Sequence, residues 1–369
     1  MRDWQDVIHE VIAERSDVEL VDPGPHGWAV RPGSVFVAAE DVPRVQRRVG
    51  ARNLPQRRLR AGARETVCCT LPEPSATAAL AEPGDDGPIS AQPNYVFLGQ
   101  PFYMGGPGTE VVQADLEHRP SGNAGRGVTI AVLDTGLADH PWFRTIYDPS
   151  QDDLPDSDGD GIMGVQAGHG TFIAGLIHKR APGAKIIALR ALDSDGVTDE
   201  AQILEALAVL RERGERIDIL NLSFGGYTQD DTPPQELSAA LEALDSSTIV
   251  VAAAGNSASD RVFWPAALPR VYGIGALEGP GGPRASFSNY GPWVDNWRPG
   301  VNLSSTFLRY NGPVRRINGV DPDSFRWWAT WSGTSFAAPL FAADVAVHMS
   351  ERDVDAPTAA EQVLDMRPT

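Results

Sequence analysis

Cysteine is almost absent from this chain of 369 residues, which contains only Cys68 and Cys69. Neighbouring cysteines are too constrained for an ordinary structural disulfide, and no spacing resembles a metal site. The sequence also lacks an apolar run long enough to cross a bilayer. Residues 1–15 lack the basic start and apolar stretch of a secretory signal and predict an amphipathic helix instead. Together these absences favour a cytoplasmic protein.

Positive charge is also scarce. The chain has 31 Lys and Arg against 49 Asp and Glu, a formal net charge of −18. Because a polyanion would be repelled over most of such a surface, we expect no general affinity for nucleic acid. Residues 44–64 are a local exception, rich in arginine. They predict either a docking face or a solvated helix face and loop.

The length and local composition predict two units. Residues 74–92 are poor in aromatic and β-branched residues, which predicts a loop or linker. A second loose stretch, residues 103–110, precedes the part with the clearest periodicity. We therefore divide the chain into a small N-terminal α+β domain, residues 1–105, and a main domain, residues 106–369.

The main domain alternates apolar runs with helical patterns. The runs are residues 128–134, 184–192, 217–224, 247–256 and 271–277. Runs that are apolar on both faces are typical of a buried parallel sheet. Residues 198–214 have acidic residues first, apolar residues at helical spacing and a terminal Gly214, which predicts a crossover helix. The pattern predicts a doubly wound, mostly parallel α/β sheet with helices on both faces.

Four polar residues lie at the boundaries of these elements. Asp134 ends the first run within "DTG", His169 lies in "GHGT", Asn256 ends "IVVAAAGN", and Ser335 lies in "WSGTSFAAP". A serine hydroxyl becomes nucleophilic when an imidazole accepts its proton, and a carboxylate fixes the tautomer of that imidazole. The tetrahedral oxyanion needs donors, which the Asn256 amide and the Ser335 backbone N–H would supply. These types predict nucleophilic acyl transfer.

Four motifs resemble those of the subtilisin-like serine proteases (subtilases), in the chain order of that family: aspartate, histidine, then serine. They are "AVLDTG", "GHGTFIAG", "AAAGN" and "SGTSFAAP". The resemblance covers about residues 110–350. It implies the subtilisin-like fold, with Asp134 as triad carboxylate, His169 as general base, Ser335 as nucleophile and Asn256 as oxyanion donor.

The resemblance also implies a polypeptide substrate, bound as an extended strand through main-chain hydrogen bonds. One edge of the cleft would be Ser223, Phe224 and Gly225. The opposite edge would be Ser194, Asp195 and Gly196. A wall of the first specificity pocket would be Ala252, Ala253, Ala254 and Gly255.

The chain departs from the family in three places. Phe172 follows "HGT", where the family usually has histidine or valine, and we expect it to lie in the core. Phe336 follows the nucleophile where many members have methionine, and we expect it to pack beneath Ser335. Residues 307–328 form a longer stretch than compact members need before the nucleophile. This stretch predicts either a rim that shapes substrate access or a β-hairpin packed on the body.

An acidic stretch, residues 153–162, imitates the start of a calcium-binding loop through Asp156, Asp158 and Asp160. The position that closes an EF-hand loop with a bidentate glutamate holds Ala167, so that pattern is broken. We expect a solvated acidic turn and no cofactor or metal; calcium is the alternative, because subtilases bind it in diverse loops.

The N-terminal region raises the question of regulation. Residues 33–49 predict a strand followed by a helix, and residues 92–97 resemble the final strand of prodomains that fold and inhibit subtilases. We expect the protein to be a serine endopeptidase whose activity is controlled by its own N-terminal domain. Three alternatives remain: a separate N-terminal docking module, a catalytically silent peptide-binding scaffold, and a precursor-processing protease or ligase.

Overall fold

The computed structural model describes residues 12–21, 27–62, 64–82, 87–99, 110–316 and 319–366. Most of the helix predicted for residues 1–15 lies outside these ranges, and so does the boundary near residue 105. The division into two domains at that point therefore stays a prediction. In the described part of the chain, no helix is long and apolar enough to cross a membrane.

Within described residues 110–316 and 319–366, six strands form a parallel central sheet in the order β14-β13-β12-β10-β7-β8. Its strands are β7 (Thr129–Asp134), β8 (Lys185–Arg190), β10 (Ile219–Leu222), β12 (Ile249–Ala253), β13 (Val271–Leu277) and β14 (Asn296–Pro299). The five apolar runs all become strands of this sheet. The sequence did not predict β14, which contains Asn, Trp, Arg and Pro.

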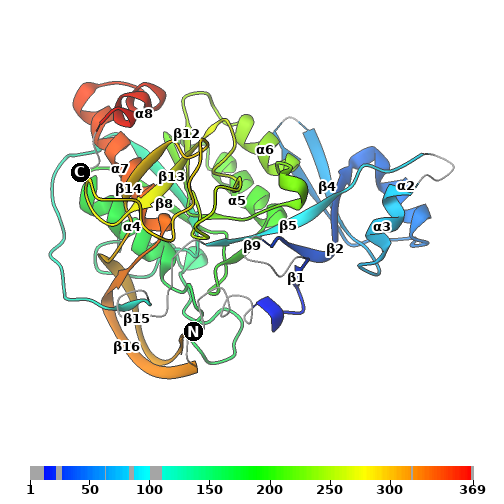
Figure 1. Ribbon diagram of the computed structural model, residues 1–369, viewed down its shortest axis with the longest axis horizontal. Coiled ribbons are helices and arrows are strands. Elements are labelled where there is room, and N and C mark those ends of the chain that lie inside the picture. The colour runs from blue at the N-terminus through cyan, green and yellow to red at the C-terminus, as the bar shows by residue number, and fades with distance from the viewer. Residues whose placement is uncertain are drawn as a thin grey trace.

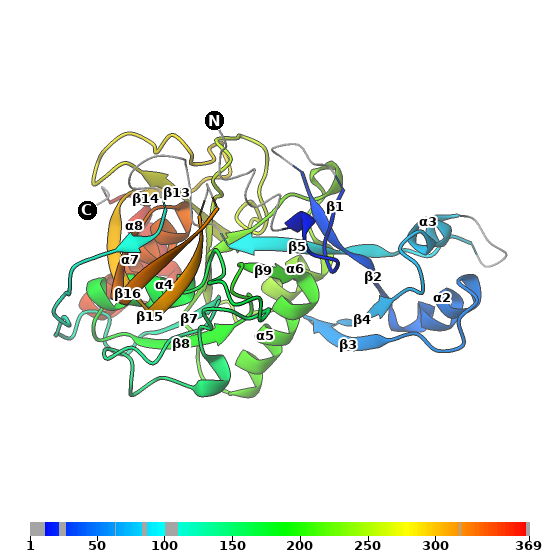
Figure 2. The same ribbon diagram turned by 90° about the horizontal axis from the view of Figure 1, so that it is seen from below.

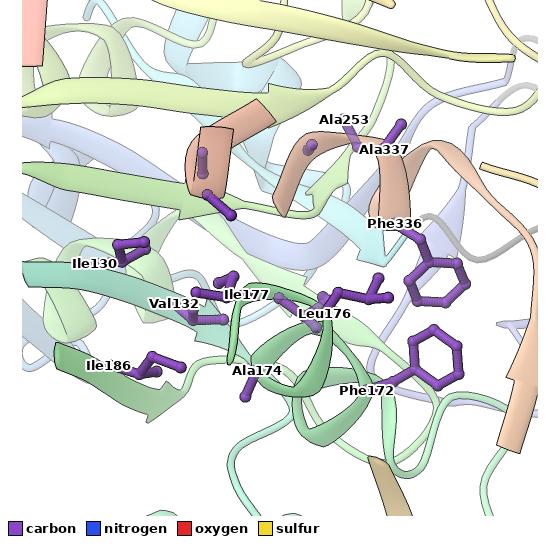
Figure 3. Close-up of a cluster of buried hydrophobic side chains, with 14 of the residues drawn as sticks. Ile130, Val132, Phe172, Ala174, Leu176, Ile177, Ile186, Ala253, Phe336 and Ala337 are labelled. Atoms are coloured by element: carbon purple, nitrogen blue, oxygen red, sulfur yellow. The ribbon is translucent and has the colours of Figure 1, made fainter. Parts of the chain in front are cut away.

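Helices cover both faces of the sheet. These helices are α4 (His169–Arg180), α5 (Glu200–Glu212), α6 (Gln235–Glu242), α7 (Thr334–Arg352) and α8 (Ala356–Leu364). Ile130 and Val132 of β7 pack in the core of α4, α7 and α8, whereas Ala131 and Leu133 pack in the core of α5 and α6. This alternation confirms the doubly wound α/β fold. Figure 3 shows the first core, in which the rings of Phe172 and Phe336 lie next to each other.

The described residues of the N-terminal region include an antiparallel sheet and helices. Its elements are β1 (Glu19–Leu20), β2 (Ala29–Ala38), α2 (Val42–Arg48), β3 (Gln56–Ala61), β4 (Arg64–Thr70), α3 (Ala76–Ala81) and β5 (Gln92–Gly99). Figures 1 and 2 show α2, α3, β3 and β4 at one end of the molecule, with β5 extending from them toward the main domain. The free thiols of Cys68 and Cys69 are both buried in this sheet.

The linker predicted for residues 74–92 is wrong in part. Residues 76–81 form α3, and β5 begins at Gln92. The helix is held by Leu80, which is fully buried in the N-terminal core, and by the Leu80 carbonyl, which accepts a hydrogen bond from the Ile89 N–H. A single buried leucine among alanines gave too weak a pattern to predict the helix.

The stretch at residues 307–328 lies in a β-hairpin packed on the body, one of its two predicted forms. Strands β15 (Leu303–Arg316) and β16 (Gly319–Trp331) pair antiparallel, and β16 also pairs with β6 (Val112–Gln113). The hairpin buries Phe307, Phe325 and Trp331 against the core that contains α4. It therefore helps to hold the helix on which His169 lies.

Candidate active site

Asp134 and His169 meet at the end of β7 and the start of α4. The Nδ1 of His169 lies 2.7 Å from Oδ1 of Asp134, and both side chains are buried. The Thr135 N–H donates to the same carboxylate oxygen at 2.8 Å. Because an ionised carboxylate only accepts hydrogen bonds, this contact favours the tautomer with the proton on Nδ1. The basic lone pair is then on Nε2.

Glycines permit the close approach of the segments that carry these two residues. A Cβ on Gly170 would lie 2.4 Å from the Gly136 carbonyl oxygen, where the "HGT" and "DTG" motifs touch. Gly168 has φ of +85° and precedes α4, and a Cβ there would lie 2.3 Å from the Phe307 ring. A side chain at either position would displace the start of the His169 helix.

A buried carboxylate, Asp153, holds the first turn of α4. It accepts hydrogen bonds from the Gly168 N–H at 2.9 Å, the Thr171 N–H at 3.1 Å and the Thr171 hydroxyl at 2.7 Å. Burial raises the pKa of Asp153 to about 6, although these donors act in the opposite direction. Since helix N-termini leave N–H groups unpaired, Asp153 acts as a cap supplied from outside the helix. We did not predict this role.

Ser335 lies in the first turn of α7, and its hydroxyl donates to the Ser223 carbonyl at 2.9 Å. The Ser223 hydroxyl in turn donates to the Ser335 carbonyl at 2.9 Å. The Nε2 of His169 is buried, with no hydrogen-bond partner among the described residues. The structure thus places the serine and histidine motifs in one buried region without a direct hydrogen bond between the two side chains. The serine hydroxyl must leave the Ser223 carbonyl before it can donate to the imidazole.

Asn256 is anchored to the start of α7. Its Oδ1 accepts hydrogen bonds from the Thr334 N–H at 3.0 Å and from the Thr334 hydroxyl at 2.8 Å. The Gly255 N–H donates to the same hydroxyl at 3.1 Å. These contacts fix the Asn256 oxygen against Thr334, the residue that precedes Ser335.

Aromatic side chains surround the imidazole. The His169 ring centroid lies 5.3 Å from that of Phe336 and 5.7 Å from that of Trp331. Phe336 is fully buried, and its ring also packs on Phe172 at 4.5 Å. Phe336 thus packs beneath the serine motif as expected. Such an apolar wall excludes water and strengthens the contact between His169 and Asp134.

A strand from the N-terminal sheet lies beside these groups. The end of β5 pairs antiparallel with β9 (Val197–Asp199) on one side and with β11 (Phe224–Gly225) on the other. The Gly99 N–H donates to the Gly196 carbonyl at 2.9 Å. Gly99 lies opposite Phe224, the neighbour of Ser223, so β5 runs toward Ser335.

The residues that the resemblance implies for the lining of the substrate cleft lie in several different elements. Phe224 and Gly225 form β11, and Gly196 accepts from Gly99. The side chains of Ser194 and Asp195 point to neighbouring loops, where they bond to Ser157 and the Val165 N–H. The four residues from Ala252 to Gly255 are buried at the end of β12. Sequence reasoning missed β9, because its partner strand β5 comes from a distant part of the chain.

The acidic turn groups Asp156, Asp158 and Asp160, whose nearest oxygens lie within 4.8 Å of one another. Asp156 accepts from the N–H groups of Gly159 and Gly161. Arg315 lies 3.3 Å from Asp160. These contacts describe a turn whose charge is partly balanced by the chain itself, and we assign no metal to it.

Comparison with known proteins gives one consistent result. The profile of the Subtilase family matches residues 125–366. The chain is 32% identical over 253 residues to a thermophilic serine proteinase from Bacillus sp. (strain AK1), covering 65% of this chain and 57% of that protein. It therefore spans little more than half the length of that relative. It is also 32% identical over 253 residues to Subtilisin BL of Lederbergia lenta, of which it covers 82%.

A solved structure, described as a cold adapted subtilisin-like serine proteinase, is 26% identical with a TM-score of 0.48. The match covers 68% of this chain and 85% of that one. The order of strands in the central sheet and the match to the family profile, and not this structural similarity, carry the fold assignment. On these grounds the chain belongs to the subtilase family of serine peptidases.

Proposed function

We propose that this protein is a serine endopeptidase that cleaves peptide bonds through an acyl-enzyme. The observation that carries the proposal is the buried contact of 2.7 Å between His169 and Asp134, at the edge of the sheet where Ser335 and Asn256 also lie. The side chains that acyl transfer requires are all present, each at the end of a strand or the start of a helix. The family membership supports the same chemistry.

In the proposed reaction, the Ser335 hydroxyl oxygen attacks the substrate carbonyl carbon and its proton passes to Nε2 of His169. Asp134 stabilises the resulting imidazolium through Nδ1. The oxyanion is stabilised by the Asn256 amide nitrogen and the Ser335 backbone N–H, which has no i−4 carbonyl at a helix start. His169 then protonates the leaving amine. In the second half of the reaction, His169 takes a proton from water, which attacks the acyl-enzyme and releases the carboxylic acid and Ser335.

We further propose that the N-terminal domain inhibits the enzyme within the same chain. The support is the pairing of β5 with both β9 and β11, which is the arrangement expected for an extended peptide bound as an added strand between them through main-chain hydrogen bonds. Phe97 is fully buried beside Phe224, with ring centroids 6.5 Å apart. A substrate would need the same backbone groups, so it could bind only after β5 leaves.

A fluorophosphonate probe tests both proposals. Wild-type protein should be labelled slowly, at Ser335, and Ser335→Ala should abolish labelling. Removal of residues 1–105 from the folded protein by limited proteolysis should increase the labelling rate. A protein that remains unlabelled after this removal would instead be a silent peptide-binding scaffold. Product analysis separates hydrolysis from ligation.

A further inference from the structure

One side chain close to the proposed catalytic base has no role in the mechanism above. Gln166 lies three residues before His169 and is fully buried. Its backbone N–H donates to the Ser194 carbonyl at 2.9 Å, which fixes the segment to the β9 edge of the cleft. Its side chain extends to the end of β5, where Nε2 donates to the Gly99 carbonyl at 3.2 Å.

The space around this amide is occupied on two sides by glycines. A Cβ on Gly99 would lie 1.9 Å from Oε1 of Gln166 and 3.3 Å from a methyl carbon of Leu192. A Cβ on Gly196 would lie 2.0 Å from Cδ of Gln166. The side chain therefore fits only because neither neighbour carries a Cβ. Gln166 is enclosed, so it cannot turn into solvent without displacing other buried atoms.

The oxygen of the Gln166 amide gives a second reason why residue 99 is a glycine. Oε1 of Gln166 is buried and has no hydrogen-bond partner among the residues described. It is the atom that a side chain on Gly99 would meet first. Gly99 does not have a left-handed φ, so the need for glycine there comes from contact with Gln166 rather than from backbone strain.

We propose that Gln166 is a specificity-determining residue that restricts one substrate position to glycine. This inference rests on the proposed function. Gly99 lies opposite Phe224, so the next substrate residue would lie opposite Ser223, whose carbonyl accepts from the Ser335 hydroxyl. That next residue is the acyl donor, and the restricted position is the one before it. The substrate class is an extended peptide with glycine as the penultimate residue before the cut.

Two internally quenched peptides test this directly. Both copy residues 95–98 (Tyr-Val-Phe-Leu) and the same acyl-donating residue, and they differ only in glycine or alanine at the penultimate position. Wild-type enzyme should prefer the glycine peptide in kcat/KM by about 10- to 100-fold, the usual range for forcing one extra carbon into a packed site. Gln166→Ala should bring the two values within about threefold. The ratio does not depend on the fraction of enzyme with a vacant cleft.

A double-mutant cycle in the full-length chain provides a second readout. Gly99→Ala should loosen the docking of β5 and raise the rate of fluorophosphonate labelling about 10- to 100-fold. The same change should have little further effect when Gln166→Ala is already present, because the colliding amide is gone. Gly279→Ala is the matched control, since Gly279 has open space around its Cβ position and an ordinary φ. It should leave labelling unchanged.

The outcomes separate the two proposals. Labelling of Ser335 in none of the variants, together with no hydrolysis, would overturn the proposed function. Hydrolysis of the glycine and alanine peptides at equal kcat/KM by the wild-type enzyme would overturn only the role of Gln166. A glycine preference that survives in Gln166→Ala would do the same, because another group would then enforce it.

Discussion

Replacing Phe97 by alanine should release the N-terminal domain from the cleft. Phe97 is fully buried although it belongs to the N-terminal sheet, and it packs in one core with Phe224 and Trp264 of the main domain. Truncation of a buried phenylalanine to alanine costs about 3–5 kcal/mol. If most of this loss falls on the docked state, the equilibrium between docked and released forms shifts by roughly 100- to 5000-fold.

The assay is the rate of fluorophosphonate labelling at Ser335 in the full-length chain. Phe97→Ala should raise that rate by about 100-fold or until the released form predominates. Phe143→Ala is the matched control, because Phe143 is equally buried but packs in the core of α4 and α7, away from β5. It should lower the thermal stability without faster labelling. Labelling of Phe97→Ala at the wild-type rate, with the expected loss of stability, would refute occlusion of the cleft by β5.

Three further predictions concern positioning, pH and docking. Asp153→Ala should lower kcat with KM little changed, and should lower Tm by about 5–10 °C in a melting curve, because donors at the start of α4 lose their acceptor; an unchanged kcat would show that the cap does not position His169. Burial raises the pKa of Glu200 to about 8 from its ordinary 4.5, and its carboxyl contacts Gln92 of β5 and the Leu237 N–H. The protonated form is therefore favoured in the folded protein. The stabilisation that Glu200 contributes is greatest below pH 4.5, declines as the pH rises to about 8 and is constant above that value. Relative to Glu200→Gln, the wild-type Tm should fall over this range, and parallel curves would contradict the assignment. Arg57→Ala should change docking by less than about 1 kcal/mol in the labelling assay, because its ion pair with Glu205 is half-exposed; a large effect would mean that this pair, and not Phe97, dominates the interface.

The central sheet could be predicted because its strands are buried on both faces. Runs such as residues 128–134 and 247–256 have polar residues only at or near their ends, and buried parallel strands are the usual reason for such a pattern. Strand β14 was missed because it lies at the sheet edge, where Asn296 and Arg298 can be satisfied by hydrogen bonds to Leu364 and Asp344. Edge position removes the apolar signal on which the prediction depends.

The site was predictable only where a motif carried its chemistry locally. Asp134 and His169 lie in short motifs with glycines, and the structure brings them together. Their roles in catalysis remain predictions. Gln166 and Asp153 gave no signal, because each acts on a partner whose position depends on the whole fold. The local sequence around Gln166 does not indicate a function, because the proposed role of this side chain depends on its contact with a strand of the N-terminal sheet.

The pairing of β5 with β9 and β11 has a consequence for the peptides that the cleft could accept. In the proposed inhibition, β5 competes with peptides as part of the same chain, so its effective concentration at the cleft is on the order of millimolar. A free peptide at micromolar levels must compete against that local excess. Dilute peptides would therefore remain uncleaved while β5 is tethered. A single cut between β5 and the rest of the chain would remove its high effective concentration, so the same peptides could then bind and be hydrolysed.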